Sequence, residues 1–469
     1  MKELDLQDKY LINFLCKRAD GLQYNEAKAN TVSSNFFVIE DLKQFLSETE
    51  LNKVNYKKLL RKFDSEKSLL SAFTQFLDER ISSSMNMAIF IHNNQSVTFE
   101  GTKLHLYYPS GTETHGDRLF EENIFSVVQE LPYTFRYKDK QLFSFRPDLT
   151  FFINGIYLGY SELKSNYNRQ SARKQGRKKV AKDYLTAVQE YLQIAKDNDL
   201  NQSIRKRFLK IFEKAIHITA TDINETFVIR TVASHFDEIK STVNAGSYDF
   251  ENYEKKLFKD FKPYPLKEKH EVKTERFEEV FKALYDKRMI EKEILYYNFI
   301  ERELIKKEGS KSKEYKHNDG RLIAPRPKQK FGTDKVLSKI DEFLAHENEP
   351  NYFLKKLEAE LRERGLGEEQ IKDLVHKRSK YQNNKTVYSL LLQYAAGFGK
   401  SNIIGWTALQ LKDLRRNDAY IYDKIMLVVD RLQLRDQLDS KMHNMNIQKG
   451  MFIEASDKKS FIKALTSNK

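Results

Sequence analysis

The chain has 469 residues, of which 40% are hydrophobic and 32% are charged, a composition that favours about three soluble globular domains. Its 81 Lys and Arg residues outnumber its 67 Asp and Glu residues, and the net charge of +14 indicates either a polyanionic partner such as nucleic acid or simply a basic protein. The single cysteine, Cys16, excludes an internal disulfide, which fits a cytoplasmic protein, and no apolar run has the length of a signal peptide or a membrane helix.

The first half of the chain alternates between helical and strand-like patterns. Residues 1–85 are predicted to be mainly helical, and residues 87–164 contain the strand candidates MAIFIH, SVTFEG and KLHLYY. An amphipathic helix is expected to interrupt them over residues 116–131. The chain is then helical and basic to about residue 198, and residues 205–260 mix strands with helices. We predict that residues 1–260 form one domain.

The second half begins with a connector and continues as an α/β pattern. Residues 261–330 are polar and broken by proline and glycine, so they are expected to connect two domains. Helices follow, and then the apolar runs VYSLLLQYAA and KIMLVVD are predicted to be buried parallel strands. Residues 331–469 would therefore form a second α/β domain.

An acidic hairpin carries the first candidate site. Asp148 precedes two apolar segments joined by Asn154-Gly155, a strong hairpin signal, and Glu162 and Lys164 end the second segment. A two-residue loop would pair Asp148 with Ser161 and turn Asp148 away from Glu162.

A bulge at Gly155 would change this register. Asp148 would then lie opposite Tyr160, diagonal to Glu162 and on the same face. A metal site therefore predicts the bulged turn, and a two-residue loop with no other bulge would contradict that site.

Two carboxylates on one face can bind Mg²⁺, which activates water and polarises a phosphodiester. Lys164 would orient the water or stabilise negative charge. We expect a further ligand from the helix over 116–131, with Glu122 the first choice and Glu121 the rival. The alternative is an inert edge hairpin with a surface Glu-x-Lys pair.

A run of cations follows the hairpin. Between Arg169 and Lys182 there are no acidic residues, and a helix would place these side chains in two adjoining stripes. Such stripes are suited to contacts with the DNA backbone, whereas the alternative is a solvated charged face. The candidate DNA-binding residues are Arg169, Arg173, Lys174, Arg177, Lys178 and Lys182.

AAGFGKS, residues 395–401, has the pattern of a phosphate-binding loop between a strand and a helix. Gly397 and Gly399 would let backbone N–H groups approach phosphate, Lys400 would neutralise its charge, and Ser401 would hold Mg²⁺. Tyr394 replaces the first glycine of the general pattern. The loop predicts ATP binding.

Pro147-Asp148 and Glu162-Leu163-Lys164 resemble the signature of the PD-(D/E)xK nucleases. The restriction subunit of type I restriction–modification enzymes adds a Gln-x-x-x-Tyr element. Its nearest counterpart here is Gln189 with Tyr191, at a different spacing, and the resemblance implies a catalytic role for Gln189.

VVDRLQLRDQ resembles the second motif of superfamily 2 motors, and APRPKQ resembles an element whose glutamine, here Gln329, recognises adenine. The resemblance implies an α/β fold: a restriction-endonuclease-like mixed sheet flanked by helices, followed by an incomplete RecA-like parallel domain. No Asp-Glu-x-His follows the phosphate loop, so the motor is expected to be truncated in this chain.

The resemblance implies Mg²⁺-dependent cleavage of double-stranded DNA, coupled in a full protein to ATP-driven translocation. It also implies modification (methyltransferase) and specificity subunits as partners. Two alternatives stay open: a nuclease–helicase fusion for defence or repair that acts without a methyltransferase, and a non-catalytic DNA-binding scaffold.

Overall fold

The computed structural model describes most of the chain. The described residues are 5–111, 116–137, 140–165, 170–198, 202–230, 232–244, 249–264, 273–302, 304–306, 313–315, 320–349, 351–381, 389–416, 419–445, 453, 455 and 457–466. Within them, no helix has both the length and the apolar character needed to cross a membrane.

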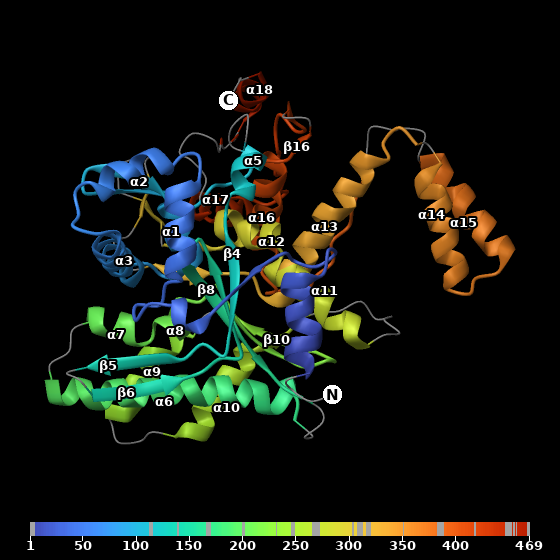
Figure 1. Cartoon of the computed structure of the whole chain (residues 1–469). Coiled ribbons are helices and arrows are strands. Elements are labelled where there is room, and N and C mark those ends of the chain that lie inside the picture. Colours follow the sequence, from blue (N-terminus) through green and yellow to red (C-terminus); the bar gives the residue numbers. More distant parts are fainter. Residues whose placement is uncertain are drawn as a thin grey trace.

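A seven-stranded mixed sheet with the order β1-β4-β7-β8-β9-β10-β11 organises the first part of the molecule (Figure 1). β4, β7 and β8 are antiparallel, whereas β1 pairs parallel to β4 and β9 pairs parallel to β8. β10 and β11 extend the far edge in antiparallel fashion. The strands of this sheet are β1 (Asn25–Ala27), β4 (Phe125–Gln129), β7 (Leu149–Ile153), β8 (Ile156–Leu163), β9 (His217–Thr221), β10 (Thr226–Ile229) and β11 (Lys262–Pro263).

Helices cover both faces of this sheet, and β7, β8 and β9 are accordingly buried along their whole lengths. On one face Phe151 of β7 stacks on Tyr285, with ring centroids 3.9 Å apart. On the other face Tyr160 of β8 packs edge-to-face against Phe212. The helices of this part are η1 (Asp5–Lys17), η2 (Ala29–Thr31), α1 (Ile39–Glu48), α2 (Lys53–Leu60), α3 (Glu66–Ser83), α4 (Met87–Asn93), α5 (Gly116–Glu121), η4 (Ala172–Gly176), α6 (Arg177–Asn198), α7 (Gln202–Phe208), α8 (Lys210–Glu213), η5 (Ala233–His235), α9 (Phe236–Asn244), α10 (Phe250–Asp260), α11 (Lys273–Tyr285), α12 (Lys287–Lys292) and η6 (Glu293–Tyr297).

Two of the predicted elements are wrong in type. MAIFIH forms the helix α4 rather than a strand, because the Asn86 side chain caps its first turn by accepting a hydrogen bond from the N–H of Ile89. Residues 116–131 form the short helix α5 and then β4, not one long helix. β4 is a strand because it lies between β1 and β7, which satisfy its backbone on both sides.

Four smaller two-stranded pairs accompany the main sheet in the described part of the chain up to residue 323. The predicted strands SVTFEG and KLHLYY form one of them. These pairs are β2 (Ser96–Phe99) with β3 (Thr102–His105), β5 (Tyr133–Tyr137) with β6 (Lys140–Phe145), β12 (Phe299–Glu301) with β15 (Arg321–Ile323), and β13 (Leu304–Lys306) with β14 (Lys313–Tyr315).

The apolar core around the main sheet continues along the chain as far as Ile294. A second, smaller core then begins at Tyr297 and centres on Trp406. The helices and the short strand pair of this second part are α13 (Pro327–Ala345), α14 (Tyr352–Glu363), α15 (Glu368–Tyr381), α16 (Lys400–Lys412), β16 (Arg415–Arg416), β17 (Ala419–Tyr420), α17 (Leu432–Asn444) and α18 (Lys458–Thr466). The proposed boundaries at residues 260 and 330 stay predictions.

The expected parallel strands of the second domain are not formed in the described residues. Residues 389–395 and 424–430 have no strand assignment, and Leu391 and Val428 are 92% and 79% exposed. A strand needs a hydrogen-bonded neighbour, and neither segment has one in the part of the chain that the structure describes. The RecA-like sheet therefore stays a prediction, and the structure supports a mixed α/β fold.

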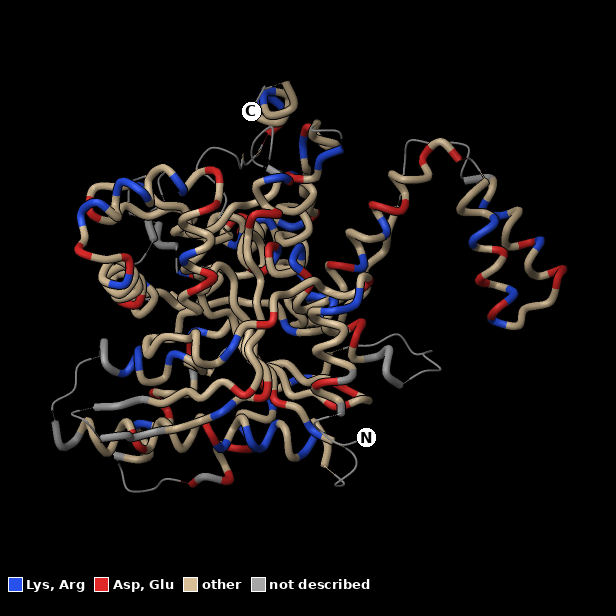
Figure 2. The backbone as a smooth tube through the Cα atoms, in the orientation of Figure 1, with Lys and Arg blue, Asp and Glu red and all other residues tan. Residues whose placement is uncertain are grey.

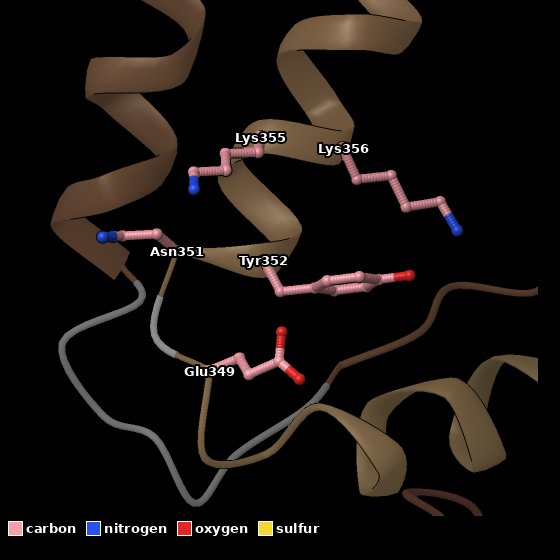
Figure 3. Close-up of a pocket in the computed structure, with 5 residues that line it drawn as sticks. All are labelled: Glu349, Asn351, Tyr352, Lys355 and Lys356. Carbon is pink, nitrogen blue, oxygen red and sulfur yellow. The ribbon is translucent and has the colours of Figure 1, made fainter.

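The pair α14 and α15 projects from the body of the molecule as a helical hairpin (Figure 1). A hollow at the start of α14 is lined by Glu349, Asn351, Tyr352, Lys355 and Lys356 (Figure 3). The Tyr352 ring stacks on His346, with centroids 3.5 Å apart. The hollow has one carboxylate and lies outside both candidate sites discussed below.

Candidate functional site

The hairpin between β7 and β8 has a different turn from the one predicted. Ile153 pairs with Ile156 across a two-residue loop, in which Asn154 and Gly155 have φ values of 50° and 79°. Both positive angles are those of a type I′ turn, so the bulge expected at Gly155 is wrong. A bulge is nevertheless present farther along β8: Phe152 pairs with Tyr157, but Phe151 pairs with Gly159.

Leu158 is the extra residue in that bulge, and it shifts every later pair by one position. Leu149 pairs with Ser161, so the next position along places Asp148 opposite Glu162. Directly opposite side chains lie on one face of a sheet. The condition for a metal site is therefore met, by a bulge in the strand instead of in the turn.

Side-chain contacts hold the turn in place. The Asn154 amide accepts a hydrogen bond from the N–H of Ile124 at 2.7 Å and donates to the carbonyl of Leu106 at 2.9 Å. The backbone of Gly155 accepts a hydrogen bond from Val38 at 3.0 Å, and a Cβ on this glycine would lie only 2.4 Å from the Val38 oxygen. The loop therefore requires glycine at this position, both for its φ and for this contact.

Asp148, Glu162 and Lys164 form a compact cluster at the end of the hairpin. The Asp148 carboxylate accepts a hydrogen bond from the N–H of Leu163 at 2.5 Å. Lys164 Nζ donates to Glu162 Oε1 at 2.8 Å and to the carbonyl of Leu163 at 2.6 Å. The Glu162 side chain is fully buried, so its charge depends on these cations.

The electrostatics of this cluster are those of crowded, buried carboxylates. Burial, reinforced by the charge of Glu162, raises the pKa of Asp148 to about 7, against the lowering effects of the Leu163 N–H and of Lys179 and Lys164. Burial also raises the pKa of Asp183 to about 7, opposed by Lys179 and reinforced by Glu162. Strongly shifted groups that act on one another are typical of functional sites.

Sequence reasoning missed two members of the cluster, Lys179 and Asp183, which lie one turn apart on α6. Lys179 Nζ donates to Glu162 Oε2 at 2.6 Å, so both oxygens of Glu162 accept from ammonium groups. Asp183 Oδ2 is buried and has no hydrogen-bond partner among the described residues. Their spacing of four residues was visible in the sequence, but which helical face meets the sheet was not.

The residues that would hold a magnesium ion are Asp148 and Glu162. In the described part of the chain, no three His, Cys, Asp or Glu side chains lie close enough together to hold a metal ion by themselves. Protein Mg²⁺ sites, however, commonly use one or two carboxylates and leave the other positions to water and substrate phosphate. Asp148 and Glu162 would supply two hard oxygen donors, and a cation there would offset both the burial and the repulsion from Glu162 that raise the pKa of Asp148.

Glu122, the predicted additional metal ligand, is not brought to the cluster in the structure. It precedes β4, whose first residue Phe125 pairs with Ile153 at the turn end of the hairpin. Asp148 lies at the opposite end of β7, roughly 15 Å away at the rise of a strand. Glu122 instead accepts a hydrogen bond from the N–H of Glu50 at 2.7 Å. The rival Glu121 is at the same end and faces Arg288 at 3.7 Å.

Gln189 is not brought to the cluster either. It is exposed on α6, ten residues beyond Lys179 and therefore about 15 Å farther along the helix axis. Tyr191 is buried and packs at a tilt against the rings of Phe208 and Phe236, which indicates a place in the core. The positions that α6 presents to Glu162 and its neighbours are those of Lys179 and Asp183.

The predicted DNA-binding cations divide into two groups. Figure 2 shows Lys and Arg gathered along the first turns of α6. Lys174 and Lys182 are exposed, and Lys178 is exposed but faces Glu254 at 3.8 Å. Arg169 lies outside the described residues.

Arg173 and Arg177 are engaged within the protein. Arg173 forms a bidentate ion pair with Glu225, and the shorter of its two hydrogen bonds to that carboxylate is 2.6 Å long. The guanidinium of Arg177 lies over Phe227 and Phe258, 4.4 and 4.6 Å from their ring centroids. The absence of acids within the run is thus misleading, because elements distant in sequence supply them.

The phosphate loop has part of the geometry that its sequence predicts. Gly397 and Gly399 have φ values of 73° and 85°, and α16 begins at Lys400 directly after them. Lys400 is exposed, and its Nζ donates to the carbonyl of Tyr394 at 3.1 Å. Ser401 follows on the first turn of α16. A 13-residue helix beginning after two such glycines is suited to bind phosphate.

Gln329 is brought to this loop from 69 residues earlier in the chain. Its Nε2 donates to the carbonyl of Phe398 at 2.7 Å, and its Oε1 accepts from the N–H of Arg326 at 2.8 Å. A Cβ on Gly399 would lie 2.5 Å from Gln329 Nε2. Gln329 therefore joins α13 to the loop, and its distance in sequence is no obstacle.

Comparison with known protein families gives an independent result for the part of the chain that holds the acidic cluster. Residues 39–195 match the family described as type I restriction enzyme R protein N terminus. No curated protein matches the chain significantly. The matched segment includes the whole β7–β8 hairpin and both Lys179 and Asp183. This segment therefore belongs to the family of the type I restriction enzyme R protein N terminus, which indicates an R subunit of a restriction system.

Proposed function

We propose that this protein cleaves double-stranded DNA by Mg²⁺-dependent hydrolysis at the cluster formed by Asp148, Glu162 and Lys164. The observation that carries the proposal is the bulge at Leu158, which turns Asp148 and Glu162 to the same face of the sheet. A regular hairpin with the same two-residue turn would separate them. The family of residues 39–195 supports endonucleolytic cleavage as the reaction.

Each residue of the cluster has a separate task. Asp148 and Glu162 would hold the ion, which when bound supplies charge neutralisation at the phosphodiester and a more acidic water. The Leu163 N–H orients the Asp148 carboxylate by its hydrogen bond. Lys164 is held by Glu162 and the Leu163 carbonyl, and from there its ammonium can stabilise negative charge that develops on the phosphate.

Nicking of supercoiled plasmid tests this proposal. We expect Mg²⁺-dependent nicking by the wild-type protein and a loss of at least about 100-fold in Asp148→Ala and Lys164→Ala, the scale on which removal of one electrostatic group lowers a rate. Glu122→Gln is the matched control, because this carboxylate is at the far end of β7, and it should nick like wild type. Equal activity of wild type, Asp148→Ala and Lys164→Ala would refute the proposal.

We further propose that the loop formed by Gly397, Gly399, Lys400 and Ser401 binds ATP with Mg²⁺ and belongs to a motor that translocates DNA. Two positive φ values before α16 and the buried contact of Gln329 with the loop support this proposal. Gln329 contacts the loop through Nε2, while its Oε1 accepts from the N–H of Arg326, so any contact with adenine would add to these roles.

For the substrate and the partners, we propose double-stranded DNA along the first turns of α6 and modification and specificity subunits of the same complex. Lys174 of η4 and Lys178 and Lys182 of α6 are exposed, and α6 also carries Lys179 of the acidic cluster. They are suited to backbone contacts without base reading, which leaves recognition of the target sequence to another subunit.

A further inference from the structure

The contacts of Glu162 raise a question about how an ion reaches it. Both of its carboxylate oxygens accept hydrogen bonds from lysine ammonium groups, Oε1 from Lys164 and Oε2 from Lys179. The Glu162 side chain is completely buried, so no third direction is open to water. Since a cation binds a carboxylate through these same oxygens, one lysine has to leave before Glu162 can hold a metal ion.

Lys164 is the less able of the two to move. Its side chain is 10% exposed, and its Nζ also donates to the Leu163 carbonyl at 2.6 Å. Gly176 packs against the aliphatic part of the Lys164 side chain: a Cβ on that glycine would lie 3.3 Å from Lys164 Cγ.

Lys179 is held far more loosely. Its side chain is 38% exposed, and within the described part of the chain Glu162 Oε2 is its one hydrogen-bond acceptor. Lys179 is therefore the lysine that can be displaced.

A second position for the displaced ammonium is already present. Asp183 follows Lys179 by four residues on α6, the spacing at which opposite charges meet on a helix. Its Oδ2 is buried and has no hydrogen-bond partner among the described residues, an arrangement that costs free energy unless a donor arrives. No cluster of three metal-ligating side chains is found in the described residues, so Asp183 is not built as a third ligand.

We propose that Lys179 is a positioning residue that alternates between two carboxylates: its ammonium occupies Glu162 Oε2 until a divalent ion binds there, and it then moves one helical turn to Asp183. In this arrangement the ammonium of Lys179 has a carboxylate partner in both states. Asp183 favours ion binding through Lys179, without contacting the ion. This inference rests on the proposed metal-dependent nuclease.

A double-mutant cycle on ion affinity tests the exchange. Mn²⁺ binding to the full chain is measured by calorimetry for wild type, Lys179→Met, Asp183→Asn and the double variant. We expect Lys179→Met to bind Mn²⁺ about tenfold more tightly, because no ammonium competes, and Asp183→Asn to bind about tenfold more weakly, because Lys179 loses its second position. In the Lys179→Met background, Asp183→Asn should change the affinity less than twofold.

If the two substitutions acted only through their charge, the single variants would shift the Mn²⁺ affinity in the same directions, but their effects on the binding free energy would add in the double variant. If Asp183 were a direct ligand, Asp183→Asn would weaken binding in both the wild-type and the Lys179→Met protein. Either result would overturn the exchange, as would unchanged affinity in Lys179→Met. Glu162→Gln is the control that places the ion at this cluster, and circular dichroism confirms that each variant is folded.

The same proteins separate this inference from the proposed function. A wild-type protein that binds Mn²⁺ with the expected cycle but does not nick plasmid would refute the nuclease and leave the exchange intact. A wild-type protein that nicks plasmid, together with additive effects in the double-mutant cycle, would refute the exchange and leave the nuclease intact.

Discussion

At the scale of single residues, the acidic cluster brings carboxylates together despite their mutual repulsion and their burial. Asp148 lies opposite Glu162 in a buried setting, and the consequence is a carboxyl group whose pKa rises to about 7. Lys164 and Lys179 offset the charge of Glu162 but leave Asp148 poorly compensated. Such an arrangement lowers the stability of the protein while it favours the binding of a cation.

We therefore expect Asp148→Asn to stabilise the protein while it removes DNA cleavage. A carboxyl with a raised folded-state pKa contributes stability that is fully present below its unfolded value near 3.8 and is lost as pH rises through about 7. The gain in Asp148→Asn should thus be small at pH 4 and on the order of 2 kcal/mol at pH 8.

Thermal unfolding at several pH values without metal measures this difference. Asp64→Asn, which changes an exposed carboxylate, is the control and should leave the pH profile unchanged. A lower midpoint temperature for Asp148→Asn at pH 8 would contradict the assignment of Asp148 as an uncompensated buried carboxylate.

At the scale of elements, α6 serves two surfaces at once. Its inner side brings Lys179 and Asp183 to the sheet, and its outer side carries exposed lysines. The cations in its sequence therefore have unlike roles. Arg177 is held against Phe227 and Phe258 and donates to the Phe261 carbonyl at 3.2 Å, which ties α6 to α10.

Paired variants of α6 and η4 should separate these roles. We expect Lys174→Ala with Lys182→Ala to weaken DNA binding and to reduce the salt dependence of log Kd by about two, roughly one for each lost phosphate contact, with no change in stability. Arg177→Ala should instead lower stability by about 1–3 kcal/mol through lost packing, at an unchanged salt dependence.

Fluorescence anisotropy at a series of salt concentrations, together with thermal unfolding, provides both measurements. If Arg177→Ala reduced the salt dependence as much as the lysine pair does, the inward placement of Arg177 would be wrong.

At the scale of the whole molecule, two apolar cores follow one another along the chain, and each carries one of the candidate sites. The core around the main sheet holds the acidic cluster, and the core around Trp406 supports α16 and its phosphate loop. Gln329 joins the start of α13 to that loop across 69 residues of sequence.

Gln329→Ala should therefore weaken nucleotide binding while it spares the acidic cluster. Loss of one hydrogen bond to the Phe398 carbonyl corresponds to about 1 kcal/mol, or about a fivefold weaker Kd for a non-hydrolysable ATP analogue. Lys328→Ala, at the exposed neighbouring position, is the control. Binding of a fluorescent analogue provides the measurement, and an unchanged Kd for Gln329→Ala would show that the loop does not depend on this contact.

The sequence by itself determined which residues are the candidates for the chemistry. Asp148, Glu162 and Lys164 were identified from spacing alone, and so were the glycines of the phosphate loop, because these signals depend on residue type and local order. The family matched by residues 39–195 confirms the resemblance. The hairpin at Asn154-Gly155 is confirmed, because two adjacent residues signal it, whereas the bulge expected at Gly155 is not formed.

Tertiary structure alone decided how those residues meet. The bulge at Leu158 depends on the pairing of β8 with its neighbours, and no local pattern marks it. The partners of Arg173 and Arg177, and the approach of Lys179 to Glu162, depend on elements that are distant in sequence. Side-chain periodicity gives the faces of a helix or strand, but only packing selects which face is buried, and here that selection completes the acidic cluster.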